Sequence, residues 1–175
     1  MRALVNSVTR WDIIFFTRIL QLDGKRLLSS GIFWISHSGN GYYYLLLPLL
    51  IYLTVPEKAL PFLIAALIAY GFELPLYKLL KSLIKRDRPC DSLKNVHKRI
   101  TPSDQFSFPS GHTAAAFVIV GLVGHFFAWL TIPAILWASL VGFSRIYLGV
   151  HYPTDILAGM AIGVLCGLSS LAIIV

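Results

Sequence analysis

The sequence FPSGHT, residues 108–113, lies where a polar part of the chain meets an apolar one. The apolar residues that follow predict a membrane-spanning helix, so Ser110 and the backbone amide of Gly111 would lie close to its N-terminus. Unpaired amides and the helix dipole favour a bound anion there, and glycine lets the ligand approach the backbone closely. The stretch therefore predicts an anion-binding site at the edge of a membrane span.

Other polar residues also stand at the edges of apolar segments, on both sides of this stretch. They are Lys81, Arg88 and Pro89 before it, and Ser144, Arg145, His151 and Asp155 after it. Taken singly, a basic residue at such an edge usually anchors to lipid headgroups, and a histidine there is usually solvated. The presence of all of them, in this order and each at an edge, favours a common binding site.

The composition indicates an integral membrane protein. Hydrophobic residues make up 57% of the 175 residues, and the mean hydropathy is +0.73. A soluble domain does not tolerate this degree of hydrophobicity. The formal net charge is +7, but the basic residues flank apolar segments, so phosphate-bearing lipids are expected as partners rather than nucleic acid.

The hydropathy pattern predicts an all-α membrane bundle with five clear transmembrane helices. These are residues 42–55, 59–80, 113–130, 133–148 and 153–175. The last one carries Gly159, Gly163 and Gly167 at every fourth position, which predicts a helix-packing face. No linker divides the chain, so residues 1–175 are expected to form one domain.

The N-terminal segment, residues 1–36, mixes apolar and charged residues at helical spacing. It predicts one or two amphipathic helices that lie in the membrane interface, or that pack on the side of the bundle. We see no signal peptide in it. Cys90, in the polar segment, and Cys166, deep in a span, are not expected to form a disulfide.

The order of the spans predicts where the polar edges meet. Alternating helices would put the end of the second span, the start of the third, the end of the fourth and the start of the fifth on one membrane face. The polar segment that joins the second span to the third, residues 81–108, holds seven of the fifteen Lys and Arg residues. Residues distant in sequence would therefore form one site at the mouth of the bundle.

The residue types at these edges suit a phosphate ester. Lys81, Arg88 and Arg145 supply positive charge, and each arginine offers a planar fork for two oxygens. His151 and Asp155 are four residues apart, so they share a face if the segment is helical. Histidine can attack phosphorus while a carboxylate orients its ring, and His112 remains as a proton donor to the leaving alkoxide.

The same residue types could also form a metal site, and two further charged residues lie inside a predicted span. Two imidazoles and a carboxylate could bind a metal, but three nearby cations argue against it, so neither a metal nor another cofactor is expected. Glu73 and Lys78 lie inside the second span, where a charge is a candidate functional group. Each could instead face the bundle or extend to the interface.

The three groups of residues resemble the signature motifs of the type 2 phosphatidic acid phosphatase superfamily. The family patterns are K-x6-RP, PSGH and SR-x5-H-x3-D. This chain matches every fixed position, with Lys81, Arg88 and Pro89, then Pro109 to His112, then Ser144, Arg145, His151 and Asp155.

The resemblance implies a helical bundle that hydrolyses phosphomonoesters or pyrophosphates through a phosphohistidine intermediate without a metal. His151 would be the nucleophile, Asp155 its partner and His112 the general acid. The phosphate ligands would be Lys81, Arg88, Ser110, Gly111 and Arg145. Membrane members commonly have six spans, so a sixth is possible within the N-terminal segment.

The resemblance and the charge pattern disagree on orientation. Bacterial relatives place the site on the outer, periplasmic face of the inner membrane, and we expect the same here. Nearly all Lys and Arg residues lie on the side of the site, however, and only Lys58 is clearly opposite, so the positive-inside tendency would put the site in the cytoplasm. Several of those cations would bind phosphate, which weakens the charge argument.

The sequence therefore predicts an enzyme that cleaves a phosphate from a membrane lipid. Candidate substrates are lipid A 1-phosphate, undecaprenyl pyrophosphate and phosphatidylglycerophosphate. The further basic residues Lys85, Arg86, Lys94, Lys98 and Arg99 could bind a large anionic headgroup or form a solvated rim. The alternatives are a phosphotransferase that uses the same phosphohistidine and a non-catalytic lipid-binding protein. The sequence does not indicate the oligomeric state.

Overall fold

A computed structural model describes residues 2–21, 26–94, 96, 99–102 and 104–174, and all regular structure within them is helical. The helices in chain order are α1 (Arg2–Leu20), α2 (Arg26–Ser38), η1 (Gly41–Leu45), α3 (Leu46–Thr54), α4 (Pro56–Ile84), α5 (Pro89–Ser92), α6 (Gly111–Phe126), η2 (Ala128–Leu130), α7 (Thr131–Tyr147) and α8 (Pro153–Ile174).

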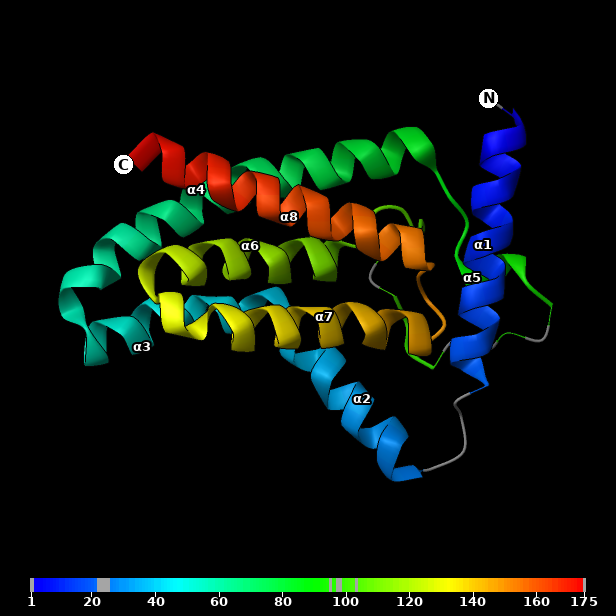
Figure 1. The fold of residues 1–175 in the computed structure, drawn as a ribbon, viewed down its shortest axis with the longest axis horizontal. Helices are drawn as coiled ribbons and strands as arrows, with labels where there is room; N and C mark the ends of the chain where they lie inside the picture. Colours follow the sequence, from blue (N-terminus) through cyan, green and yellow to red (C-terminus); the bar gives the residue numbers. More distant parts are fainter. Residues whose placement is uncertain (1, 22–25, 95, 97–98, 103, 175) are drawn as a thin grey trace.

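The bundle consists of α3, α4, α6, α7 and α8, which run roughly along one direction, while α1 crosses one end of it (Figure 1). Within the described residues, three segments are long and apolar enough to cross a membrane, residues 56–92, 128–147 and 153–174. Gly41–Thr54 and Gly111–Phe126 are shorter apolar helices at the positions of the other two predicted spans. The all-α membrane bundle is confirmed, and five crossings stay a prediction.

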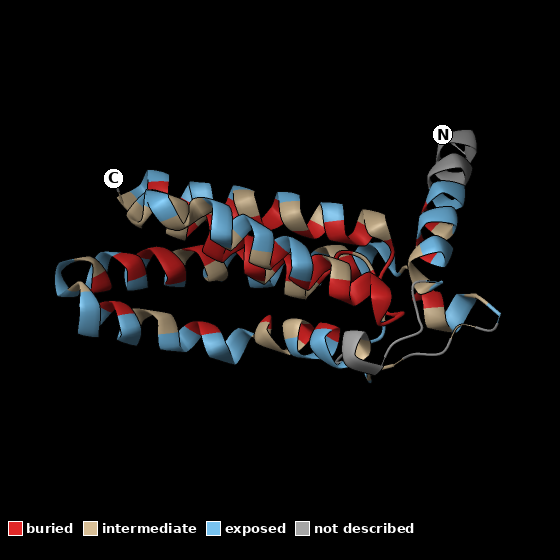
Figure 2. Ribbon diagram, turned by 60° about the horizontal axis from the view of Figure 1, so that its bottom comes forward, coloured by how far each residue is buried: buried red, intermediate tan, exposed pale blue. Residues whose placement is uncertain are grey.

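The interior and the outer surface of the bundle differ as expected for a protein in lipid. Figure 2 shows buried residues on the inward faces of the helices and exposed residues along their outer faces. Many of the exposed residues are large and apolar, among them Leu53, Leu67, Leu83, Leu136 and Leu165. Exposure of this apolar surface to water would be unfavourable, whereas contact with the hydrocarbon of a bilayer would not be.

The tightest packing in the bundle joins α6 to α8. A Cβ atom at Gly159 would lie 2.5 Å from the carbonyl oxygen of Ser110, and one at Gly163 would overlap the carbonyl oxygen of Ala114. The predicted glycine face is therefore confirmed as a place where two backbones meet directly. This contact fixes the start of α6 against the start of α8.

The N-terminal helix α1 combines both roles that the sequence left open. Phe16 is buried against Ile146, Tyr152 and Ile156 of the bundle, whereas Trp11 is 62% exposed. One face of α1 thus packs across the end of the bundle and another carries exposed aromatic and apolar residues, as in an interfacial helix. Cys90 and Cys166 are free thiols, as predicted.

Some boundaries differ from the prediction. Lys81 lies in the last turn of α4 rather than in a loop, and the segment after it contains the short helix α5. The third span was expected to reach residue 130, but α6 ends at Phe126, because Phe127 adopts a non-helical backbone with φ −142° and ψ 67°. These shifts do not move any polar edge away from its predicted end of the bundle.

Candidate active site

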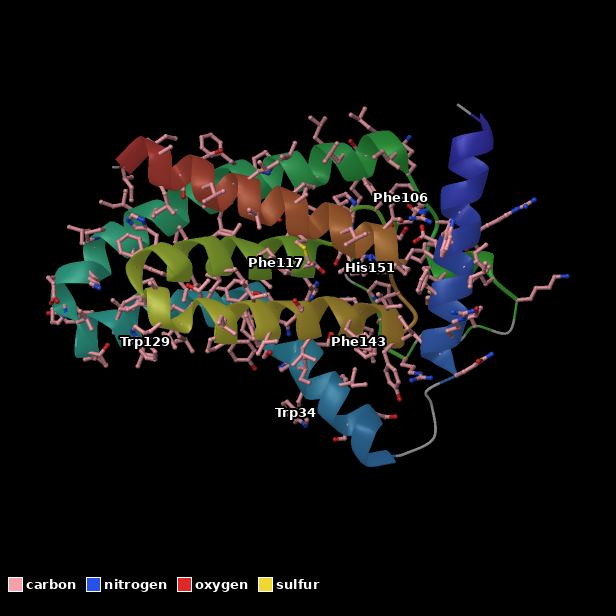
Figure 3. All side chains as sticks on the ribbon, in the orientation of Figure 1. Trp34, Phe106, Phe117, Trp129, Phe143 and His151 are labelled. Atoms are coloured by element: carbon pink, nitrogen blue, oxygen red, sulfur yellow. The ribbon has the colours of Figure 1, made fainter. Side chains whose placement is uncertain are left out.

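One cavity of about 180 Å³ collects most of the predicted site residues. Its lining includes Lys81, Arg88, Gly111, His112, Arg145 and His151. Figure 3 labels His151 near the end of the bundle that α1 crosses, far from Trp129 at the other end. The predicted convergence of sequence-distant polar residues at one end of the bundle is therefore what the structure shows.

His151 and Asp155 face each other at the start of α8. The His151 Nδ1 atom lies 3.6 Å from Asp155 Oδ2, slightly beyond hydrogen-bonding distance. Asp155 is itself held by the backbone N–H of Tyr152 at 2.8 Å and by Arg86 Nη1 at 2.8 Å. The carboxylate is thus fixed behind the imidazole, with the opposite nitrogen, Nε2, directed towards Arg88 at 3.4 Å.

The surroundings of His151 favour the neutral imidazole. Burial is the main cause that lowers its pKa to about 4; Asp155 opposes this shift, and the nearby charges of Arg145 and Arg88 contribute to it. At neutral pH the ring is therefore unprotonated, with a lone pair available for attack.

Two of the predicted phosphate ligands bind a carboxylate in this structure. Asp104 Oδ1 accepts hydrogen bonds from Lys81 Nζ at 2.7 Å and from Arg88 Nη2 at 2.6 Å. Burial would raise the pKa of Asp104, but the hydrogen bonds and charges of Lys81 and Arg88 outweigh it and hold that pKa below its usual value. The two cations therefore converge on one oxyanion position, as a phosphate oxygen requires.

His112 and Arg145 face both this cavity and a neighbouring one of about 200 Å³. His112 Nε2 lies 2.9 Å from Asn40 Oδ1, and the amide nitrogen of Asn40 lies 2.9 Å from His37 Nδ1. Arg145 Nη1 donates to Ser36 Oγ at 2.8 Å. The end of α2 and Asn40, which follows it, thus hold His112 and Arg145 in place.

Ser110 and Gly111 occupy the N-terminus of α6, as predicted, but differ in exposure to the cavity. Gly111 lines it, whereas Ser110 is fully buried and caps the helix through Thr113. The Ser110 hydroxyl lies 2.9 Å from the hydroxyl of Thr113, and its backbone N–H donates to the carbonyl oxygen of Asp155 at 3.0 Å. Ser110 joins α6 to α8, and its direct contact with phosphate stays a prediction.

Arg86 differs from its expected place at a headgroup or on a solvated rim. It donates to Asp12 Oδ2 at 2.6 Å and to Asp155 Oδ1 at 2.8 Å, so it connects α1 to the carboxylate behind His151. Lys85 and Lys94 are exposed, and the guanidinium of Arg99 lies 4.4 Å from the ring centre of Tyr147. His97 and Lys98 lie outside the described residues.

Asp12, Asn40 and Asp104 were not singled out in the sequence. Each lies outside the three motifs, and the chain has other acids at similar positions, such as Asp87 and Asp91 beside Asp104. Only the tertiary contacts distinguish them. The described part of the chain brings no three His, Cys, Asp or Glu side chains together in a possible metal-binding group.

Comparisons with known proteins agree with this geometry. The model of the PAP2 superfamily matches residues 58–175. The chain is 39% identical over 132 residues to the bacitracin transport permease protein BcrC of Bacillus licheniformis, covering 72% of this chain and 63% of that protein. It is 37% identical over 110 residues to phosphatidylglycerophosphatase B of Bacillus subtilis, covering 57% and 51%.

Two solved structures have a similar fold. Aquifex aeolicus LpxE superposes with a TM-score of 0.81 and 31% identity, covering 93% of this chain and 95% of that one. A transmembrane PAP2 type phosphatidylglycerolphosphate phosphatase from Bacillus subtilis gives 0.74 and 30%, covering 96% and 86%. Together with the apolar spans, these likenesses establish an integral membrane protein. Since the family match covers well over half of the sequence and includes all three motifs, the chain belongs to the PAP2 superfamily.

Proposed function

We propose that this protein hydrolyses a phosphate monoester or pyrophosphate on a membrane lipid, without a metal, through a phosphohistidine intermediate. The observation that supports this most directly is the buried His151, with the Asp155 carboxylate on one side of its ring and Arg88 3.4 Å from its Nε2 atom. The chain spans only 63% and 51% of the two curated relatives described above, so their activities are not simply transferred to it.

The first step would transfer the phosphoryl group to His151. Its Nε2 attacks phosphorus, the bond between phosphorus and the leaving oxygen breaks, and His112, in its protonated form, donates its proton to that oxygen. The leaving group is the lipid alcohol in a monoester and the lipid monophosphate in a pyrophosphate. Asp155, 3.6 Å from Nδ1, balances the positive charge that the ring gains. In the second step water attacks phosphorus, His112 takes its proton, and phosphate and neutral His151 are released.

The phosphate oxygens would be stabilised by Lys81, Arg88, Arg145 and the amide at Gly111, with Ser110 at the same helix end. Asp104 now occupies the position between Lys81 and Arg88. A phosphate bound by both cations would replace Asp104 in those hydrogen bonds. The Asp104 carboxylate would therefore have to move away when substrate binds.

The three candidate substrates are lipid A 1-phosphate, undecaprenyl pyrophosphate and phosphatidylglycerophosphate. Relatives of this chain carry names that point to each type of lipid, including an undecaprenyl-diphosphatase of Sulfolobus acidocaldarius and a lipid A 4'-phosphatase of Bacteroides thetaiotaomicron. The phosphate-binding residues are the same whatever the lipid, so they do not choose among the three. We further propose the bacterial inner membrane as the location, with the site facing the periplasm.

The proposal is tested by phosphate release from the purified protein in detergent, with EDTA present, from each of the three lipids. We expect release from at least one lipid, and a loss of roughly a thousandfold or more in the His151→Ala variant, because the nucleophile is gone. An unchanged thermal midpoint would show that the variant is folded.

Two results would contradict the proposal. Wild-type turnover by folded His151→Ala would exclude the phosphohistidine, and no release from any lipid by folded wild-type protein would exclude the hydrolase. Adding an acceptor lipid in the second case separates a phosphotransferase from a non-catalytic protein, because only the transferase would then produce a new phospholipid.

A further inference from the structure

Glu73 is a buried carboxylate that the proposed chemistry does not use. It lies in the middle of α4 and is 1% exposed, and neither of its oxygens has a hydrogen-bond partner among the described residues. Three nearby phenols donate elsewhere. Tyr44 donates to the carbonyl oxygen of Gly39 and Tyr70 to that of Ala115, both at 3.0 Å, and Tyr77 donates to Asp104 Oδ2 at 3.1 Å. A carboxylate buried without a partner is costly, so its presence indicates a ligand.

Glu73 stands where two cavities meet. One is the cavity that contains His151, Lys81 and Arg88. The other, of about 550 Å³, lies between α4 and the segment formed by η1 and α3. The residues that line both are Gly41, Glu73, Leu74 and Ala115. The two cavities are therefore adjacent, and Glu73 lines the border between them.

The larger cavity suits a hydrocarbon chain. Apart from Glu73, its lining consists of apolar and aromatic residues of η1, α3 and α4, together with Ala115 of α6. Leu45 is 75% exposed and Leu67 is 64% exposed, so the cavity opens onto the outer surface of the bundle, where lipid chains lie. Its occupant would be the substrate lipid itself, since the cavity adjoins the one lined by the proposed phosphate ligands Lys81 and Arg88.

The order of residues along α4 sets the order of groups in that lipid. Lys81 lies at the proposed phosphate site, and Glu73 is eight residues earlier in α4. The residues Tyr70, Leu67 and Leu63, which line the larger cavity, come before Glu73. Eight residues correspond to about 12 Å along a helix. The part of the substrate beside Glu73 is therefore the alcohol to which the phosphate is esterified, ahead of the chains.

We propose that Glu73 is a specificity-determining residue that accepts a hydrogen bond from a hydroxyl or amide N–H on this alcohol. The inference rests on the proposed phosphatase function and narrows its substrate class. A glycerol hydroxyl, as in phosphatidylglycerophosphate, or a sugar amide, as in lipid A, would satisfy the carboxylate. The polyprenyl alcohol of undecaprenyl pyrophosphate and the diacylglycerol of phosphatidate carry no such donor and would leave it unpaired.

The test compares kcat/KM for two lipids that carry the donor, lipid A and phosphatidylglycerophosphate, with two that lack it, undecaprenyl pyrophosphate and phosphatidate. We expect wild type to prefer a donor-bearing lipid. Glu73→Leu should lower kcat/KM for that lipid by roughly tenfold, because the hydrogen bond to the Glu73 side chain is lost and the donor on the lipid is left unpaired. It should leave kcat/KM for the donor-free lipids unchanged or higher, because it removes an unpaired carboxylate.

Two further variants make the test independent of folding. Glu73→Gln keeps one acceptor oxygen, so it should lower activity on the donor-bearing lipid less than Glu73→Leu does. Glu57→Leu removes an exposed carboxylate at the other end of the same helix and should change neither class of substrate. Size-exclusion profiles and thermal midpoints in detergent identify any variant that has lost its fold.

An equal loss on both lipid classes in folded Glu73→Leu and Glu73→Gln, or no loss on either, would overturn the role of Glu73. A wild-type protein that hydrolyses only the donor-free lipids would also overturn it while leaving the phosphatase function intact. Wild-type protein inactive on all four lipids would instead overturn the phosphatase function.

Discussion

The proposed role of His151 as nucleophile requires a neutral imidazole. Its pKa is lowered to about 4 by burial and by the charges of Arg145 and Arg88, so protonation should begin only well below neutral pH. Histidine NMR of the detergent-solubilised protein, with a His151→Gln spectrum to assign the signal, would measure this. We expect a midpoint near pH 4, and a midpoint near 6.5 would mean that the ring is solvated rather than buried.

The sequence predicted which polar residues would converge at one end of the bundle, but not their partners. Lys81, Arg88 and His151 were found because fixed spacing at span edges is visible in one dimension. Asp104, which binds the first two, and Asn40, which binds His112, come from segments whose approach depends on the whole fold. Ser110 shows the same limit. Its position at a helix N-terminus was predicted correctly, but its complete burial depends on how the helices pack, which the sequence does not show.

At the scale of elements, two ion pairs of Arg86 connect α1 to Asp155, the carboxylate proposed to assist His151. Asp12 is 1% exposed, accepts from Arg86 at 2.6 Å and from the backbone N–H of Thr154 at 3.0 Å, and Arg86 reaches Asp155. Asp12→Ala removes one of the two carboxylates that pair with Arg86, and it removes the hydrogen bond between α1 and the backbone of Thr154. We expect it to destabilise the protein by about 3 kcal/mol, as for other partly broken buried ion pairs, and to lower kcat more than it raises KM.

Thermal unfolding and steady-state kinetics in detergent would check both effects. The exposed Asp87→Asn variant, in the segment next to Arg86, serves as the control and should behave as wild type. Loss of stability with kcat unchanged would show that α1 is only a structural support, and wild-type behaviour of Asp12→Ala would show that the contact carries neither role.

Helix existence was easier to predict than helix ends. The four longest apolar segments each became a helix within a few residues of the expected bounds, because hydropathy is averaged over many positions. The end of α6 at Phe126 and the start of α7 at Thr131 depend on local backbone geometry around η2, which composition does not reveal. The amphipathic pattern before residue 36 correctly suggested helices and left their packing open.

At the scale of the whole molecule, orientation in the membrane is a separate question from fold. The site and Lys94 lie at one end of the bundle and Glu57 begins α4 at the other. In a Cys90→Ser background, Lys94→Cys and Glu57→Cys each place an exposed thiol at one end. A membrane-impermeant maleimide added to intact cells should label residue 94 and not residue 57 if the site faces the periplasm.

Labelling of residue 57 alone would place the site in the cytoplasm, in agreement with the distribution of Lys and Arg. Labelling after the cells are opened provides the control, since both thiols should then react. The sequence could not decide this point, because the same cations that suggest a cytoplasmic face also have a reason to be at a phosphate site.

The backbone contact between α6 and α8 divides the site into two parts with different freedom to move. Gly159 and Gly163 leave no side chain between the two helices, so His112 at the start of α6 and His151 just before α8 belong to one stiff body. The cations Lys81 and Arg88 sit on and just beyond α4, which also borders the lipid-facing cavity. Any widening of this cavity that admits a lipid would therefore move Lys81 and Arg88, the proposed phosphate ligands. The distance between His112 and His151 would stay the same.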